Sequence, residues 1–429
     1  FFLCALLRPV LTTLACTAGA AIAATGNGPA AALAESGRSG ISRSRAHGVI
    51  VVSEIALAIV LLAGASLFAE TVRRLGSDPT GFDPENLTVL SVRAPVSMIR
   101  GVGPAARARR TAEIEAALAS VPGVGSVAGT SSAPFAGGYG GNGIEIEGKT
   151  FDPKPNARRQ IVTESFFRTM GMPLLRGRGF NGGDSADMRQ AVISEDFERR
   201  YFDGAAIGKR FSLNDEWMEV IGVVGNMKLV DLTDGAEPTF FALSRQLPSW
   251  WVNQYVVRSA VPPDAIMPSL REAIRAYDAR LLLDTAEPME SLMTKAMAEE
   301  RYRALLASIF GMSGLMLAAV GLYGLLARDV ADRRREIGLR MALGARPADV
   351  IRMIGRQGMG LVLLGLLAGV PAAIGAGRLV ASLLYGVKPG APGVLVIVVA
   401  VLAAAAVLAT IVPALRASRV DPMVALRSV

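Results

Sequence analysis

Residues 143–150 read Gly-Ile-Glu-Ile-Glu-Gly-Lys-Thr and match the spacing of a phosphate-binding loop. Such a loop needs flexible residues whose N–H groups curl around phosphate, and a helix that begins at the lysine. Here the loop positions alternate as a strand does, and their two carboxylates would repel phosphate. Pro153 and Pro155 then disfavour a helix. We therefore predict no nucleotide site at Lys149.

Other catalytic and metal-binding chemistries lack the residues they need. The single histidine is His47, which lies among arginines, and the two cysteines are Cys4 and Cys16. This set excludes zinc sites and histidine-dependent triads. Asp184 and Asp187 lie in a glycine-rich stretch that either holds a hard cation or forms a solvated loop. The sequence therefore predicts neither an enzyme nor a resident cofactor.

The most distinctive charged segment is 328–356, which lies between two long apolar runs and contains eight arginines. Residues 333–343 continue a helix, Gly344 and Ala345 end it, and Pro347 suits the first turn of another helix. Two helices joined in this way either present a rigid edge to a cytoplasmic partner or form a passive, positively charged loop.

Four apolar segments are long enough to cross the roughly 30 Å hydrocarbon core of a bilayer as helices. The composition supports this class, because 51% of the 429 residues are hydrophobic and only 19% are charged. The four segments are 49–68, 304–327, 358–385 and 393–415. We interpret residues 1–24, a poorer candidate, as the last membrane helix of a preceding half.

Arginines flank these spans and set their orientation. Arginines precede the first span, fill 328–356 and follow the last span, whereas the connection 386–392 carries only Lys388. The positive-inside rule then places the first linker, residues 328–356 and the C-terminus in the cytoplasm. The same arginines explain the net charge of +8, so we expect no nucleic-acid partner.

This topology places residues 71–301 outside the membrane as one large domain. Helical and strand patterns interleave along it, which predicts an α+β domain with two lobes. Residues 105–120, for example, form an amphipathic helix with Ile114, Leu118 and Val121 on one face.

The predicted fold class is an α-helical membrane protein with four transmembrane helices, a remnant of an N-terminal one, and a large α+β extracytoplasmic domain. In chain order, the predicted segments are a preceding membrane helix at 1–24, a cytoplasmic linker at 25–47, a membrane helix at 48–70, the extracytoplasmic domain at 71–301, a membrane helix at 302–327, the cytoplasmic element at 328–356, a membrane helix at 357–385, a short outer loop at 386–392, a membrane helix at 393–415 and a cytoplasmic tail at 416–429.

Two features inside the predicted spans have alternative interpretations. Gly365 and Gly369 either allow close helix packing or reflect how common glycine is in membrane helices. Glu54 lies within the first span, where a carboxyl group is either a proton or substrate site, or a snorkelling or inter-helix contact.

Several motifs, in the right order over nearly the whole chain, resemble those of FtsX-like permeases. These permeases are the membrane subunits of ABC transporters of the macrolide-exporter and lipoprotein-release type. The motifs are Gly-Phe-Asp-Pro at 81–84, Met-Gly-Met-Pro-Leu-Leu-Arg-Gly-Arg-Gly-Phe at 170–180, Arg-Glu-Ile-Gly-Leu-Arg-Met-Ala-Leu-Gly-Ala at 335–345, and Pro-Ala-Leu-Arg-Ala-Ser-Arg-Val-Asp-Pro at 413–422.

The resemblance implies a separate cytoplasmic ATPase, two permease halves in each transporter and a bacterial inner-membrane location. It also implies a set of coupling residues without a catalytic role: Glu336, Gly338, Arg340, Gly344 and Ala345. Residues 1–40 resemble the end of another half, so we expect a duplicated permease of which this chain is the second half.

Our first functional hypothesis is therefore a non-catalytic permease subunit that couples ATP hydrolysis by its partner to export of hydrophobic or peptidic substrates. A second is a mechanotransducer that controls an extracytoplasmic protein partner. A third is a membrane-anchored receptor without an ATPase, in which residues 328–356 would be dispensable.

Overall fold

The computed structural model describes residues 39–418, apart from 96–101, 138–139, 186, 231, 233–234, 236, 248–251, 344–345 and 389. The helix predicted at 1–24 lies outside the described residues. The chain divides into two compact units, Phe1–Ala69 with Ala304–Val429, and Glu70–Arg303. Each unit has its own hydrophobic core.

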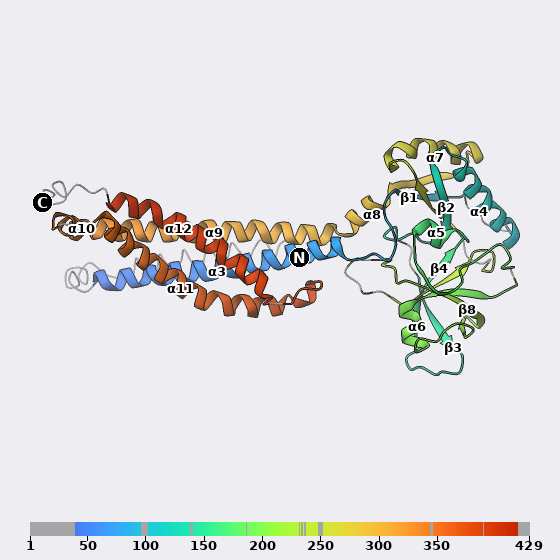
Figure 1. The fold of residues 1–429 in the computed structure, drawn as a ribbon, viewed down its shortest axis with the longest axis horizontal. Helices are drawn as coiled ribbons and strands as arrows, with labels where there is room; N and C mark the ends of the chain where they lie inside the picture. The colour runs from blue at the N-terminus through green and yellow to red at the C-terminus, as the bar shows by residue number, and fades with distance from the viewer. Residues whose placement is uncertain are drawn as a thin grey trace. The chain divides into compact units, whose positions relative to one another are not determined.

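The first unit is a bundle of long helices. They are α3 (Ser39–Ser77), α9 (Ala298–Asp332), α11 (Pro347–Leu379) and α12 (Pro392–Ser418), with the short helices α10 (Arg334–Ala342) and η2 (Ala381–Leu383) between them. The four long helices are labelled in Figure 1. Each is long and apolar enough to cross a membrane, as predicted. Much of their apolar surface faces outward, and Leu367 is 73% exposed, which suits contact with lipid.

Small residues let α11 pack closely against α3. A Cβ atom on Gly365 would lie 2.8 Å from Cβ of Ile55, and one on Gly369 would lie 2.7 Å from Cδ1 of Ile59. Ile55 and Ile59 are themselves buried. No larger side chain fits at either glycine without separating the helices, so the close-packing interpretation is confirmed.

Glu54 lies where α3 meets α9. A Cβ atom on Gly321 of α9 would overlap the carboxylate oxygen Oε2 of Glu54. Within the part of the chain that the structure describes, this oxygen is buried and accepts no hydrogen bond. The structure therefore places Glu54 in an inter-helix contact rather than in a snorkelling position.

The second unit combines strands and helices, as predicted. Its strands are β1 (Leu87–Arg93), β2 (Val124–Thr130), β3 (Gly141–Ile146), β4 (Asn156–Val162), β5 (Leu174–Gly177), β6 (Gln190–Ser194), β7 (Arg210–Leu213), β8 (Glu216–Val224), β9 (Thr239–Leu243), β10 (Gln254–Ser259) and β11 (Leu282–Pro288). Its helices are α4 (Pro104–Ala119), α5 (Phe166–Met170), α6 (Glu195–Tyr201), α7 (Pro263–Tyr277) and α8 (Met289–Ala296).

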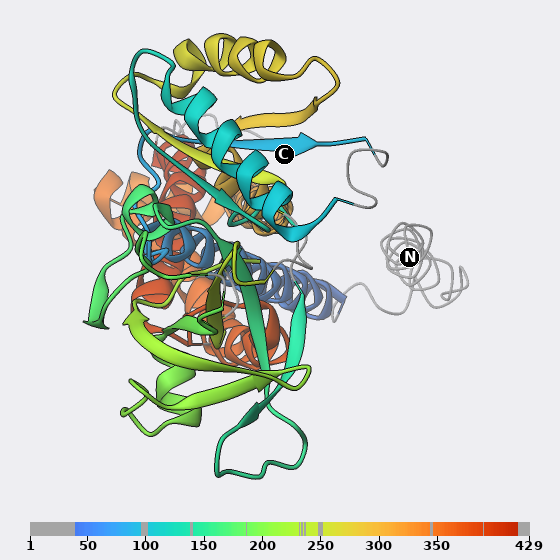
Figure 2. The ribbon, with the colours of Figure 1, turned by 90° about the vertical axis from the view of Figure 1, so that its right-hand side faces the viewer.

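The first lobe of this unit is an antiparallel sheet in the order β11-β1-β10-β2. Figures 1 and 2 both show α4 and α7 beside one another on this sheet. The predicted face of α4 is buried there, with Ile114, Leu118 and Val121 in one core cluster. Alternate residues of β1 point to the opposite face, where Val89 shares a cluster with Phe166 of α5.

The second lobe is a closed ring of six strands. Neighbouring strands pair in the order β4-β3-β7-β8-β6-β9, and β9 pairs in turn with β4. Its core contains Phe197 of α6, Phe211 and Phe240, all fully buried, with ring centroids 5.1 Å and 5.2 Å apart for successive pairs. A single β2–β4 residue pair, Thr130 with Val162, joins the two predicted lobes.

Candidate functional site

The short helix α10 connects two membrane helices and is held by packing. Only Arg333 separates it from the end of α9, and its Ile337 is 1% exposed in a cluster with Val350 and Ile354 of α11. Helix α11 begins at Pro347, with the N–H of Arg346 donating to Oδ2 of Asp349 at 3.1 Å. The two helices predicted on either side of 344–345 are therefore present and form a fixed corner, but the first of them does not continue α9 as predicted, because the helix breaks at Arg333.

The predicted coupling residues occupy different parts of this corner. Glu336 and Arg340 form an ion pair one turn apart on the exposed surface of α10, and Nη1 of Arg340 lies 3.2 Å from Sδ of Met353. Gly338 is buried on the packed side. Gly344 and Ala345 lie outside the described residues. An exposed pair at this spacing contributes about 0.3–0.5 kcal/mol, so the fold depends little on it.

The sequence analysis missed two further candidate site residues, Leu339 of α10 and Leu343, which caps the C-terminal end of that helix. Leu339 is 51% exposed and Leu343 is 81% exposed, one helical turn apart. Two leucines at this spacing in a strongly charged segment were the available signal. Exposed apolar side chains rimmed by charges are typical of protein interaction surfaces. We call Glu336, Leu339, Arg340 and Leu343 the α10 surface.

The segment that matches a phosphate-binding loop has a different structure. Residues 143–146 lie in strand β3, and Ile146 forms a β-bridge with Lys149. The ammonium group of Lys149 lies 2.6 Å from Oδ2 of Asp203 and 3.0 Å from the carbonyl oxygen of Tyr201. The charge of Lys149 is therefore paired with Asp203, and the turn that contains this lysine does not have the geometry of a phosphate-binding loop.

Asp187 is exposed, as the solvated-loop interpretation predicts, but Asp184 is buried against Arg178, so that interpretation was wrong for Asp184. Asp184 is 2% exposed, and its two oxygens accept from the guanidinium of Arg178 at 2.9 Å and 2.7 Å. The backbone N–H of Asn181 also donates to it, at 2.8 Å. The bonds from Arg178 hold the pKa of Asp184 below its usual range. Among the described residues, no group of three or more possible metal ligands occurs.

We expect Asp184→Asn to destabilise the outer unit at neutral pH by about 1–3 kcal/mol, because the buried carboxylate that Arg178 binds is replaced by a neutral amide. The folded pKa is depressed, so the ionised form stabilises the fold above the unfolded pKa of about 3.9, and this contribution is lost as pH falls through the folded pKa. Thermal unfolding of the full chain from neutral to acidic pH measures both effects.

The control for this measurement is Asp187→Asn, which removes an exposed carboxylate three positions away. The difference between wild type and Asp184→Asn should shrink on acidification, while the control should follow the wild type throughout. A constant difference at every pH would contradict the assigned role of the Asp184 carboxylate.

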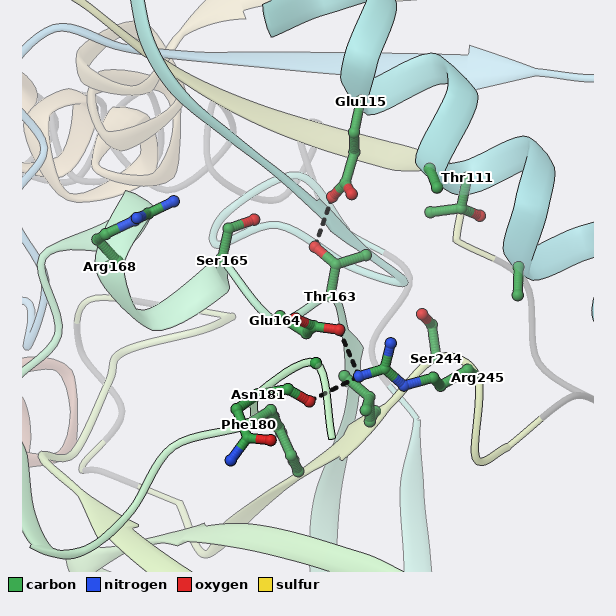
Figure 3. A pocket seen from close by; sticks show the side chains of 14 residues that line it. Thr111, Glu115, Thr163, Glu164, Ser165, Arg168, Phe180, Asn181, Ser244 and Arg245 are labelled. Carbon is green, nitrogen blue, oxygen red and sulfur yellow. Dashed lines mark hydrogen bonds and ion pairs between the residues drawn. The ribbon is translucent and has the colours of Figure 1, made fainter. Parts of the chain in front are cut away.

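A cleft of about 620 Å³ opens where the two lobes of the outer unit meet. Figure 3 shows the residues that line it, from α4, from the segments that follow β4 and β9, and from 180–182. Oε1 of Glu115 accepts hydrogen bonds from the hydroxyl of Thr163 at 2.5 Å and from the N–H of Gly129 at 2.7 Å. Burial raises the pKa of the Glu115 carboxyl, and these two bonds oppose the rise.

Two family models match the chain. The MacB-like periplasmic core domain matches residues 49–277, more than half of the chain, and the FtsX-like permease C-terminal region matches residues 308–422. The chain belongs to the MacB-like, FtsX-type permeases of ABC transporters. The resemblance that the sequence motifs indicated is thus confirmed, and the second match includes α10 and the α10 surface.

Named relatives of this MacB-like permease carry the description macrolide export ATP-binding/permease protein MacB. The protein from Chromobacterium violaceum is 26% identical over 280 residues, which are 62% of this chain and 42% of the relative. The protein from Paracoccus denitrificans is 29% identical over 227 residues, 50% of this chain and 33% of the relative. The chain thus spans less than half the length of these relatives.

Solved structures similar to this MacB-like permease include the periplasmic region of MacB from Actinobacillus actinomycetemcomitans. It is 14% identical, with a TM-score of 0.37 over 52% of this chain and 97% of that one. The family assignment and the four apolar helices make the permease a multi-pass protein of the bacterial inner membrane with an extracytoplasmic α+β domain.

Proposed function

We propose that this permease couples ATP hydrolysis by a separate cytoplasmic ATPase to conformational change in its extracytoplasmic domain. The observation that carries the proposal is the α10 surface. Its exposed leucines and its ion pair are mounted on a helix that Ile337 fixes against α11. An ATPase that binds this surface would push on a rigid corner rather than on a flexible loop.

Contacts around α10 support transmission into the membrane helices. The side-chain amide of Gln357 on α11 donates to Asp329 of α9, which ties the two helices together beside α10. Helix α9 is continuous over Ala298–Asp332, so it transmits a displacement at its α10 end along its length. We propose that α10 and the C-terminus face the cytoplasm, following the arginine distribution.

We further propose that the working transporter contains two permease halves and exports hydrophobic or peptidic molecules. The family relationship supports this proposal. Coupling requires only the α10 surface and the helices behind it, so it does not depend on where a substrate enters the transporter.

The test is purification of the tagged chain from native membranes, with identification of co-purifying proteins and an assay of ATP hydrolysis. The informative variant is Glu336→Ala with Arg340→Ala. We expect an ATPase to co-purify with the wild type, and to be lost or uncoupled in the double variant because two charged groups of the docking surface are removed.

The matched control is Arg328→Ala with Asp332→Ala, which removes an exposed ion pair of the same spacing on α9. This control should retain the ATPase. Absence of any ATPase from the wild-type preparation would refute coupling and leave the receptor hypothesis. A co-purifying extracytoplasmic protein, with hydrolysis that no small molecule alters, would identify a mechanotransducer.

A further inference from the structure

The cleft of the outer unit lies at a branch point of its strands. β4 and β9 are parallel neighbours with Val162 opposite Leu243, and both end at the cleft. Beyond this point β4 leads into α5, whereas β9 leads into the segment 244–247. Diverging segments at the carboxyl ends of parallel strands leave a crevice, which is a frequent position for ligand sites.

Small side chains on α4 keep this crevice open. Ala108, Thr111, Ala112 and Glu115 all line the cleft and recur at helical spacing along one side of α4. Two of the four are alanines, so the helix leaves space where larger side chains would fill it. The volume of about 620 Å³ lies within the range of small-molecule sites.

The opposite wall is preformed. The guanidinium of Arg245 donates from Nε to the carbonyl oxygen of Asp184 and from Nη2 to that of Asn181, both at 2.7 Å, and it forms an ion pair with Glu164. Figure 3 shows the arginine directed at Glu164 and Asn181. The charge of Glu164 is thereby compensated. Phe180 adds an apolar surface, itself fixed by stacking on Phe167.

Among the residues that the structure describes, Glu164 has a charged partner in Arg245, whereas Glu115 has none. Both of its hydrogen bonds reach Oε1 and come from neutral groups, Thr163 and the N–H of Gly129. Within the described ranges, no basic side chain forms an ion pair with Glu115, and no group donates to its Oε2. Arg168 is exposed and lies on the far side of Ser165 from Glu115 in Figure 3.

We propose that this cleft binds a small cationic molecule, with one ammonium group at Oε2 of Glu115 and an apolar body against Phe180 and Leu243. A partly buried carboxylate without a counter-ion is unfavourable unless a ligand supplies the missing charge. The fixed bonds at Oε1 aim the other oxygen, so little ordering is required when a ligand binds. This proposal does not rest on coupling to an ATPase, since binding needs neither nucleotide nor partner.

The experiment uses the full chain in detergent and the fluorescent amine dansylcadaverine, which carries a primary ammonium group and an aromatic body. Its N-acetyl derivative keeps the body and lacks the charge, and it measures partition into the detergent. We expect saturable binding of the amine to the wild type. Glu115→Gln should weaken binding by about tenfold or more, the range for a charge-assisted hydrogen bond.

Two variants make the result specific. Glu272→Gln removes an exposed carboxylate on α7, outside the cleft, and should bind the amine as the wild type does. Ala112→Phe fills the cleft without changing its charge and should abolish saturable binding even if Glu115→Gln folds poorly. Equal affinity of the wild type for the two probes, or undiminished binding by Glu115→Gln or Ala112→Phe, would overturn the proposal.

Discussion

Gly365→Leu combined with Gly369→Leu is expected to separate α11 from α3 and to destabilise the membrane bundle. Cβ atoms at these positions would lie 2.8 Å from Cβ of Ile55 and 2.7 Å from Cδ1 of Ile59, and both isoleucines are fully packed. Overpacking costs about 1–3 kcal/mol at each position, which corresponds to a fall in Tm of roughly 5–20 °C. Thermal unfolding of the detergent-solubilised chain measures this.

The control for the glycine pair is on the same helix. Gly360→Leu with Gly375→Leu adds the same atoms where nothing lies within 4 Å of either Cβ position. This pair should leave Tm close to that of the wild type. Equal shifts for the two double variants would show that glycine content, rather than the α3–α11 contact, determines bundle stability.

Leu339→Asn with Leu343→Asn is expected to abolish productive coupling to the ATPase while leaving the fold intact. Both leucines are at least half exposed, so their replacement costs the isolated chain little. At the centre of an interface, losing such an apolar contact costs about 1–2 kcal/mol or more, so two lost contacts imply a loss of affinity of about 30-fold or greater. The ATPase retained on the tagged chain and its hydrolysis rate report this loss.

A leucine outside the α10 surface serves as the comparison. Leu282 on β11 is 62% exposed, and Leu282→Asn should retain both ATPase and hydrolysis. If the double variant on α10 keeps wild-type hydrolysis and wild-type ATPase content, the α10 surface is not the docking site.

Local sequence patterns were sufficient to predict the membrane helices and the start of α11, but not the break at Arg333 that separates α10 from α9. The membrane helices are long apolar runs, and Pro347 suits the first turn of α11. Such signals act over a few residues. They could therefore be interpreted without knowing which helices become neighbours.

The cleft and the closed ring could not be predicted in this way. Parallel pairing of β4 with β9 joins distant segments, and neither strand carries a local signal for its partner. Glu115 is adjacent in sequence to the buried Ile114, yet its environment depends on Gly129 of β2 and on Thr163, which follows β4. Asp184 was misjudged for the same reason. Its glycine-rich surroundings suggested solvent, whereas Arg178 and the fold bury it.

The most direct test of the coupling proposal is site-specific photo-crosslinking in native membranes, with a photoreactive residue at Leu343 or at Leu379. The two leucines are 81% and 86% exposed, so both report what lies beside them. If an ATPase docks on the α10 surface, we expect an adduct between Leu343 and an ATP-binding protein, and none from Leu379 at the other end of α11. Absence of that adduct at Leu343, or the same adduct at both positions, would contradict docking at this surface.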